Sequence, residues 1–243
     1  MKPVPDPLDP TSPEFAARRA EARKALDAID PAMTGDMTDP LRRDWFEAVY
    51  ALAEHDPARV PWANLSAHPL TRAWIGLQGR GVEGLSVLDI GCGLGDNAEC
   101  FATQGARVTA FDFVPAAVAW AKRRFPETSV DYRTADLFAL PEAWQGQFDL
   151  VHECYTLQAL SFELLPRALG IFKTLLKPQG RLLIVARGRA EDEKISGPPW
   201  PLPPSFFQEA ETQGLRCLAL EDITATAEVT RRHWRALLGP ASA

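Results

Sequence analysis

From residue 85 onwards, short runs of apolar residues alternate with stretches that carry one apolar face at helical spacing. The apolar runs predict strands, and the amphipathic stretches predict helices between them. The strands are expected at 85–90, 107–112, 129–133, 147–151 and 180–186, and the helices at 95–104, 114–124 and 161–177. Pro115 and Pro178 mark the start of one helix and the stop of another. This alternation favours right-handed βαβ units and a parallel sheet.

The last third of the chain has a different pattern. A helix is expected at 203–213 and a strand at 215–221. A final strand at 229–238 follows without an intervening helix, which predicts that these two strands pair antiparallel. The expected fold class is therefore α/β, with a doubly wound, mostly parallel sheet whose last strand is antiparallel.

The first eighty residues carry no strand pattern. Ser12 and Pro13 have the character of a helix start, and Asp39-Pro40 is expected to begin a second helix, whose apolar face recurs at Leu41, Trp45, Val49 and Leu52. A stretch rich in proline and a short helix around 70–77 follow. We expect residues 1–80 to form a helical cap and residues 81–243 to form the sheet domain.

Composition excludes several function classes. The chain has 243 residues and a formal net charge of −6, and it has no basic stripe of the kind that binds nucleic acid. The sequence contains no apolar run of membrane-spanning length and no apolar signal-peptide core, so we expect a soluble cytoplasmic protein without a membrane partner. Four cysteines without CxxC spacing make a metal site or a disulfide framework unexpected. Oligomeric state stays open.

Glycines and acids gather at the predicted carboxyl ends of the first strands. They lie in the segments Asp89-Ile-Gly91-Cys-Gly93-Leu-Gly95, Asp112-Phe113 and Asp136-Leu137. In a doubly wound sheet, ligands bind outside these strand ends, and glycine lets a backbone approach a ligand closely. Three acids suit a ligand rich in hydroxyl and amino donors, such as an adenosine. They suit a pyrophosphate poorly, and the spacing of the glycines departs from the dinucleotide pattern Gly-x-Gly-x-x-Gly.

This arrangement resembles the class I S-adenosylmethionine-dependent methyltransferases over about residues 85–190. The resemblance implies a seven-stranded sheet, S-adenosylmethionine as cofactor and S-adenosylhomocysteine as product. It also implies that the glycine loop packs on the methionine part, that Asp112 holds the ribose and that Asp136 with Leu137 meets the adenine. The expected cofactor-binding residues are Trp45, Asp89, Gly91, Gly93, Gly95, Asp112, Phe113, Asp136, Leu137 and Glu153.

Further segments are similar to the thiopurine, thiol and halide methyltransferases. They are Gly197-Pro-Pro-Trp200 after the fifth strand, and Trp45 and Trp62 in the cap. The chain has Cys154 where thiopurine methyltransferases have an arginine. This resemblance implies methyl transfer to a small molecule, with a thiol, a sulfide or a similar soft nucleophile as the first acceptor.

The expected catalytic residues are His152 and Glu153, for proton handling or substrate orientation, and Trp62, as an aromatic cover. Aromatic faces favour a sulfonium cation and exclude water. O- or N-methylation of a metabolite, a non-catalytic protein that binds the cofactor, and a nucleotide-linked oxidoreductase remain the alternatives.

Overall fold

The computed structural model describes residues 8–35, 38–195, 197–224 and 229–241. In this part of the chain seven strands form one sheet, in the order β3-β2-β1-β4-β5-β7-β6. The strands are β1 (Ser86–Ile90), β2 (Arg107–Asp112), β3 (Asp131–Thr134), β4 (Phe148–Cys154), β5 (Leu176–Arg187), β6 (Leu215–Ile223) and β7 (His233–Pro240). Strands β1 to β5 are parallel, and β7 runs antiparallel to both β5 and β6. The predicted fold class is confirmed.

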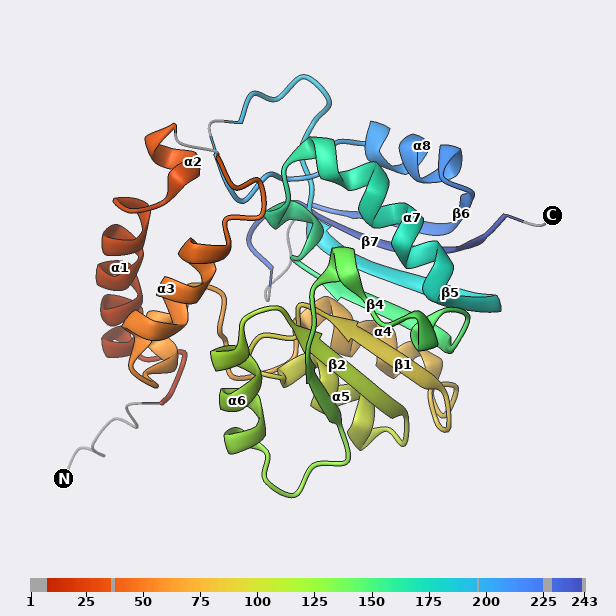
Figure 1. The fold of residues 1–243 in the computed structure, drawn as a ribbon, viewed down its shortest axis with the longest axis horizontal. Helices are drawn as coiled ribbons and strands as arrows, with labels where there is room; N and C mark the ends of the chain where they lie inside the picture. The colour runs from red at the N-terminus through yellow and green to blue at the C-terminus, as the bar shows by residue number, and fades with distance from the viewer. Residues whose placement is uncertain (1–7, 36–37, 196, 225–228, 242–243) are drawn as a thin grey trace.

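Helices cover both faces of the sheet (Figure 1). One face packs against α4 (Pro69–Gln78), α5 (Asp96–Thr103) and α6 (Pro115–Arg124), and the other against α7 (Leu165–Leu175) and α8 (Ser205–Thr212). Successive side chains of a strand point to opposite faces of the sheet. Val87 therefore packs in the core under α4, α5 and α6, whereas Leu88 and Ile90 pack in the core under α7 and α8. Because most positions on the central strands β1 and β4 are buried, these strands have largely apolar sequences.

The strand order indicates which edge of the sheet can bind a ligand. Strand β1 pairs with β2 on one side and with β4 on the other, so the direction of winding reverses beside β1. Loops that follow β1, β2, β3 and β4 leave the sheet at the same edge, because these strands are parallel. A crevice at such a reversal point is where doubly wound sheets bind ligands.

Three helices form a cap beside this edge (Figure 1): α1 (Pro13–Asp27), α2 (Pro31–Thr34) and α3 (Arg43–Ala53). As expected, Ser12 caps α1, and its hydroxyl accepts a hydrogen bond from the Phe15 amide at 3.1 Å. Helix α3 begins later than predicted. The Asp39 carboxylate accepts hydrogen bonds from the amides of Leu41 and Arg43, which holds residues 39–42 in a turn before the helix.

The fourth helix does not belong with the cap. Ile75 of α4 packs in the core between the sheet and α5, and the Thr71 hydroxyl bonds to His152 of β4. The predicted cap of residues 1–80 therefore contains two kinds of structure, since α1 to α3 lie beside the sheet edge and α4 packs on the sheet. The boundary at residue 80 stays a prediction, and the packing of α4 on the sheet favours a boundary in the loop before this helix.

Two further boundaries differ from the prediction. The helix predicted at 161–177 is α7, and it ends at Leu175 because Leu176 already pairs with Phe148 as part of β5. The last strand, predicted from residue 229, begins at His233, and residues 225–228 lie outside the described part of the chain. Short 3-10 turns lie at Pro57–Arg59, Leu137–Ala139, Glu142–Trp144, Leu157–Ala159 and Phe162–Leu164. None of the helices described here is long and apolar enough to cross a membrane.

Candidate active site

The glycine loop between β1 and α5 forms the floor of the site. Gly91, Gly93 and Gly95 all have positive φ angles, of 63°, 53° and 90°. A Cβ atom on Gly91 would overlap the hydroxyl of Thr156, whose side chain donates to the Ile90 carbonyl at 3.0 Å. The loop after β4 therefore packs directly on the loop after β1, and glycine is required at Gly91 both for its backbone angle and for space.

Replacing Gly91 with alanine is expected to destabilise the fold through strain and overlap together. Gly146 is a matched control, because its φ of 65° is nearly the same and nothing lies within 4 Å of its Cβ position. Gly146→Ala should lower the free energy of unfolding by about 1–2 kcal/mol, the cost of a left-handed residue. Gly91→Ala should cost about 1–3 kcal/mol more, the range for overpacking. Urea unfolding measures both, and Thr156→Ala should restore part of the Gly91→Ala loss; equal losses for the two alanine variants would contradict this packing.

Asp112 closes β2 and reaches over the glycine loop. Its carboxylate accepts hydrogen bonds from the amides of Gly93 and Val114, both at 3.0 Å. The side chain is buried, and burial raises the pKa of Asp112 to about 6 against the lowering effect of these amides. Near neutral pH the group is mostly ionised and can accept hydrogen bonds from a diol.

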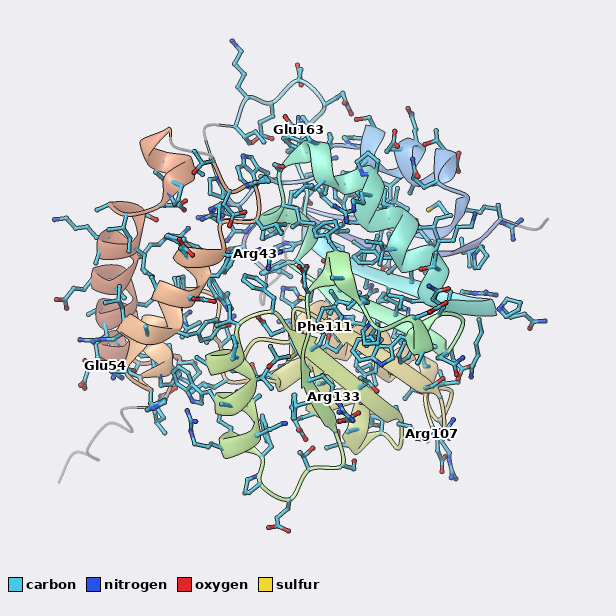
Figure 2. The ribbon with its side chains drawn as sticks, in the orientation of Figure 1. Arg43, Glu54, Arg107, Phe111, Arg133 and Glu163 are labelled. Atoms are coloured by element: carbon cyan, nitrogen blue, oxygen red, sulfur yellow. The ribbon has the colours of Figure 1, made fainter. Side chains whose placement is uncertain are left out.

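Asp136 follows β3 and lies under the cap. One oxygen accepts from the Phe138 amide at 2.9 Å, and the other pairs with Arg43 of α3 at 2.6 Å. Figure 2 shows Arg43 lying between the cap and the sheet, with its helix on one side. This pair, one-third exposed, links the cap to the strand end and closes one side of the site.

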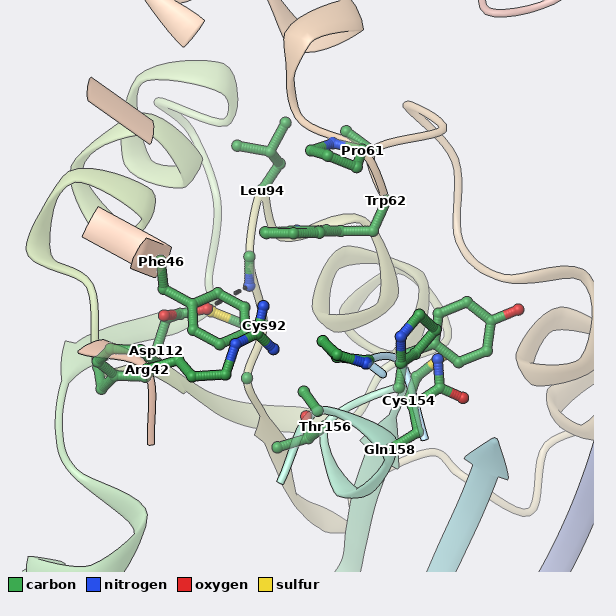
Figure 3. Close-up of a pocket in the computed structure, with 18 of the residues that line it drawn as sticks. Arg42, Phe46, Pro61, Trp62, Cys92, Leu94, Asp112, Cys154, Thr156 and Gln158 are labelled. Carbon is green, nitrogen blue, oxygen red and sulfur yellow. Dashed lines mark hydrogen bonds between the residues drawn. The ribbon is translucent and has the colours of Figure 1, made fainter. Parts of the chain in front are cut away.

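Aromatic side chains from the cap cover the glycine loop. Trp62 lies 5.7 Å from Phe46 and 6.2 Å from Trp45 between ring centroids, and its indole N–H lies 3.3 Å from the Tyr50 hydroxyl. Arg42 stacks 4.2 Å from the Trp45 ring and is paired with the buried Asp30. Figure 3 shows Trp62 across the cavity from Thr156, with Phe46 and Arg42 on one side and Cys154 and Gln158 on the other.

These elements enclose a cavity of about 450 Å³. Eight of the residues singled out from the sequence line it: Trp45, Trp62, Gly91, Gly93, Asp112, Phe113, Asp136 and Leu137. The other four, Asp89, Gly95, His152 and Glu153, do not. The volume is in the usual range for a small-molecule site. An acidic strand end beside a cradle of positive-φ glycines fits the adenosine and methionine parts of S-adenosylmethionine.

His152 was expected to handle protons, but the structure places it below the cavity. The imidazole is fully buried, with Nδ1 at 2.7 Å from an Asp89 carboxylate oxygen and Nε2 at 3.0 Å from the Thr71 hydroxyl. Phe101 packs on the ring at 5.1 Å. One Asp89 oxygen pairs with His152, and the other has no hydrogen-bond partner among the described residues; through this pair and Thr71, Asp89 and His152 connect β1, β4 and α4 inside the sheet layer.

Glu153 is also fully buried. Its Oε2 atom accepts hydrogen bonds from the amides of Thr156 and Leu157, which fixes the turn after β4. Burial raises the pKa of Glu153 to about 8, and Oε1 has no hydrogen-bond partner among the described residues. Gly95, the fourth residue outside the cavity, begins α5 and packs against Tyr132. In the structure Glu153 therefore stabilises the turn after β4, and Gly95 forms the end of the glycine loop before α5.

A chain of hydrogen bonds that the sequence did not reveal lies at the other end of the cavity. His68 Nδ1 accepts from the Leu70 amide, so Nε2 carries the proton and donates to the Tyr155 hydroxyl at 3.0 Å. His233 Nδ1 donates to the Arg231 carbonyl, so its Nε2 accepts from Tyr155 at 2.6 Å. Burial lowers the pKa of His68 to about 3 and also lowers that of His233. Both imidazoles are therefore neutral near pH 7.

The Gly197-Pro-Pro-Trp200 segment and Cys154 also lie at the cavity. Pro198 and Pro199 line the cavity, and the Trp200 amide donates to the Gln158 carbonyl at 2.7 Å, which ties this segment to the loop after β4. Cys154 lines the cavity, and burial raises the pKa of its thiol, so the thiol stays protonated. Among the described residues no group of three or more metal-ligating side chains occurs.

Comparison with known proteins agrees with this geometry. Residues 87–180 match the methyltransferase domain family. The match covers the glycine loop, Asp112, Asp136 and the strands that carry them, and it agrees with the methyltransferase activity predicted from the sequence.

Curated relatives that this chain matches are named as O-methyltransferases. A ubiquinone biosynthesis O-methyltransferase of Methylocella silvestris is 35% identical over 137 residues, covering 51% of each chain. A Pseudomonas aeruginosa protein of the same name is 41% identical over 86 residues, covering 35% of this chain and 37% of that one. The chain thus spans about half or less of the length of these curated relatives.

Solved structures share the fold at low sequence identity. A Burkholderia thailandensis 1,6-didemethyltoxoflavin-N1-methyltransferase, solved with S-adenosylhomocysteine, has a TM-score of 0.68 at 18% identity and covers 85% of this chain and 92% of that chain. The [4+2]-cyclase SpnF has a TM-score of 0.60 at 19% identity and covers 71% of this chain and 81% of that chain. One fold therefore accompanies different reactions, and the acceptor has to be argued from the site.

Proposed function

We propose that this chain transfers the methyl group of S-adenosylmethionine to a small-molecule acceptor. The observation that carries the proposal is the convergence of Gly91, Gly93, Asp112 and Asp136 on one cavity beneath an aromatic cover. When bound, the cofactor supplies an electrophilic methyl group on a sulfonium. The task left to the protein is to hold the acceptor in line with that methyl group and to exclude water.

The residues of the cavity divide this task. In this proposal the Asp112 carboxylate accepts hydrogen bonds from a ribose diol, and Asp136 with Leu137 meets the adenine. The positive-φ glycines let the backbone approach the methionine part. Trp45, Phe46 and Trp62 offer aromatic faces, which attract a cation and repel water. None of these roles needs a general base, which agrees with the burial of His152 and Glu153 away from the cavity.

The acceptor atom is the open part of the proposal. The aromatic cap and the Gly197-Pro-Pro-Trp200 segment favour a thiol, a sulfide or a similar soft nucleophile, because of their similarity to the thiol and halide enzymes. The relatives named as O-methyltransferases favour oxygen as the second candidate. A matched panel of thiols, halides, phenols and amines, assayed for release of S-adenosylhomocysteine, separates these candidates.

Two binding measurements test the proposal itself. Calorimetry should show binding of S-adenosylmethionine and S-adenosylhomocysteine but not of NAD; binding of NAD alone would instead support a nucleotide-linked oxidoreductase. Cofactor binding without turnover on any acceptor of the panel would favour a non-catalytic binding protein.

Trp62→Ala is expected to separate cofactor binding from turnover. Removing the indole opens the aromatic cover to water and takes away one face for the sulfonium, a loss of about 0.5–2 kcal/mol for the cation. We expect the turnover rate to fall by about tenfold, with a smaller change in the affinity for the uncharged S-adenosylhomocysteine thioether. Steady-state kinetics and calorimetry measure the two effects, and Trp74→Ala on α4, outside the cavity, is the control. An unchanged turnover rate would exclude the cover from catalysis.

A further inference from the structure

Arg187 is a half-buried cation at the end of the cavity opposite Asp112 and Asp136. It is the last residue of β5, and its amide donates to the Gln158 side chain at 2.7 Å, which fixes the position of the backbone. Its guanidinium interacts with Tyr155, with the guanidinium carbon 6.0 Å from the centre of the ring. Its Nε atom is buried and has no hydrogen-bond partner in the described part of the chain.

No ion pair compensates this charge within the described residues. Among the described residues the fully buried arginines are paired, Arg42 with Asp30 and Arg235 with Glu221. The half-buried Arg19, which also lines the cavity, has no ion pair in this part of the chain but donates to the Ala63 carbonyl and to the Asn64 side chain. Burial lowers the pKa of Arg187, and the charges of Arg231 and Arg23 lower it further. A half-buried guanidinium with a spare donor and cationic neighbours is a costly arrangement unless an anion joins it.

The groups around Arg187 carry no negative charge near pH 7. Burial keeps His68 and His233 neutral and raises the pKa of the Tyr155 hydroxyl, so Tyr155 stays protonated. The Tyr155 hydroxyl is already committed to donating to His233. Asp27 of α1 also lines the cavity, but it is exposed and lies one helical turn from the exposed Arg23. Arg187, together with the neighbouring Arg23, therefore gives this end of the cavity a positive charge.

We infer that the Arg187 end of the cavity binds the methyl acceptor as a small organic anion, held by the guanidinium. The inference rests on the proposed function and adds the charge of the acceptor to it. An anionic nucleophile shares its electron pair with the methyl carbon as the bond from carbon to sulfur breaks, and the sulfur keeps that pair. Where the nucleophilic atom itself carries the negative charge, as in a thiolate, no proton moves, and neutral His68 and His233 suffice. Amines, which are cationic near pH 7, are disfavoured at this end.

The inference is tested with matched anionic and neutral probes. We would saturate the protein with S-adenosylhomocysteine and titrate it with 4-(methylthio)benzoate and 4-hydroxybenzoate, and with the benzamide that corresponds to each, so that only the carboxylate charge differs within a pair. The acids should bind at least tenfold more tightly than the amides. Arg187→Met should abolish this preference, Arg187→Lys should retain part of it, and Arg216→Met, which removes an exposed arginine on β6, should leave it intact.

The outcomes that overturn the inference are distinct from failure of the proposed function. Amides that bind as tightly as acids, no binding of either probe, or a preference that survives in Arg187→Met would each overturn it. A tenfold loss of S-adenosylhomocysteine affinity in Arg187→Met would also overturn it, because Arg187 would then hold the cofactor. If wild-type protein binds no S-adenosylhomocysteine at all, the proposed function fails first. Circular dichroism of each variant confirms that the fold is retained.

Discussion

Asp112→Asn is expected to weaken S-adenosylhomocysteine binding by about 1–3 kcal/mol, or about 5- to 150-fold. The substitution keeps the size of the side chain but removes the charge that strengthens hydrogen bonds from a ribose diol. In wild-type protein the affinity should also depend on pH. Burial raises the pKa of Asp112 to about 6, so protonation below that pH removes the acceptor and the affinity should fall on acidification.

The pH profile makes this prediction specific. Titration calorimetry between pH 5 and pH 8 should show the change near pH 6 in wild-type protein and no such change in Asp112→Asn. The opposite sign holds for stability. Because the folded pKa lies above the usual value of 3.8, this group contributes stability below about pH 4, and the contribution is lost as pH rises through about 6. Asp131→Asn, at an exposed position on β3, should change neither property; unaltered affinity in Asp112→Asn would refute the ribose assignment.

His152→Asn is expected to destabilise the fold strongly. Asparagine cannot reach both Asp89 and Thr71, so the Asp89 carboxylate would stay buried without its partner. Breaking a buried pair of this kind costs about 3–5 kcal/mol. For a chain of this size that corresponds to a fall in Tm of about 6–20 °C.

A thermal unfolding series distinguishes this structural role from a catalytic one. His55→Asn, at an exposed position with a positive φ that asparagine tolerates, is the matched control and should change the Tm little. The double variant Asp89→Asn/His152→Asn should lose less stability than the sum of the losses in the two single variants, because the two residues interact. A normal Tm for His152→Asn combined with lost turnover would return His152 to the catalytic role expected from the sequence.

The strands and helices predicted for the sheet domain are present in the structure, because the sequence patterns that predict them are local. Alternation of strand and helix needs only neighbouring residues, and so do the glycine loop and the acids that close β2 and β3. The differences arise where a distant partner decides. Leu176 is part of β5 rather than α7 because it pairs with Phe148 of β4. Helix α4 is not part of the cap because its apolar face packs on the sheet.

The acceptor end of the cavity shows what local patterns miss. His68, Tyr155, Arg187 and His233 come from four separate segments, and they meet because β4, β5 and β7 are neighbours in the sheet. Tyr155 and Arg187 each stand at or just after a strand end, a position that the strand pattern marks. His68 and His233 carry no such signal, since a histidine in a loop or at the start of a strand has many ordinary roles.

The sequence by itself determined the succession of strands and helices along the chain, the glycine loop and the acids at the strand ends. Each of these depends on residues that are close together in the chain. Only the tertiary structure decided which polar groups face the cavity. It turned His152 and Glu153 inward, away from the cavity, where they bond to neighbouring strands and loops, and it brought Arg187 to the wall of the cavity. Side-chain direction and burial depend on packing between distant segments, and no local pattern contains that information.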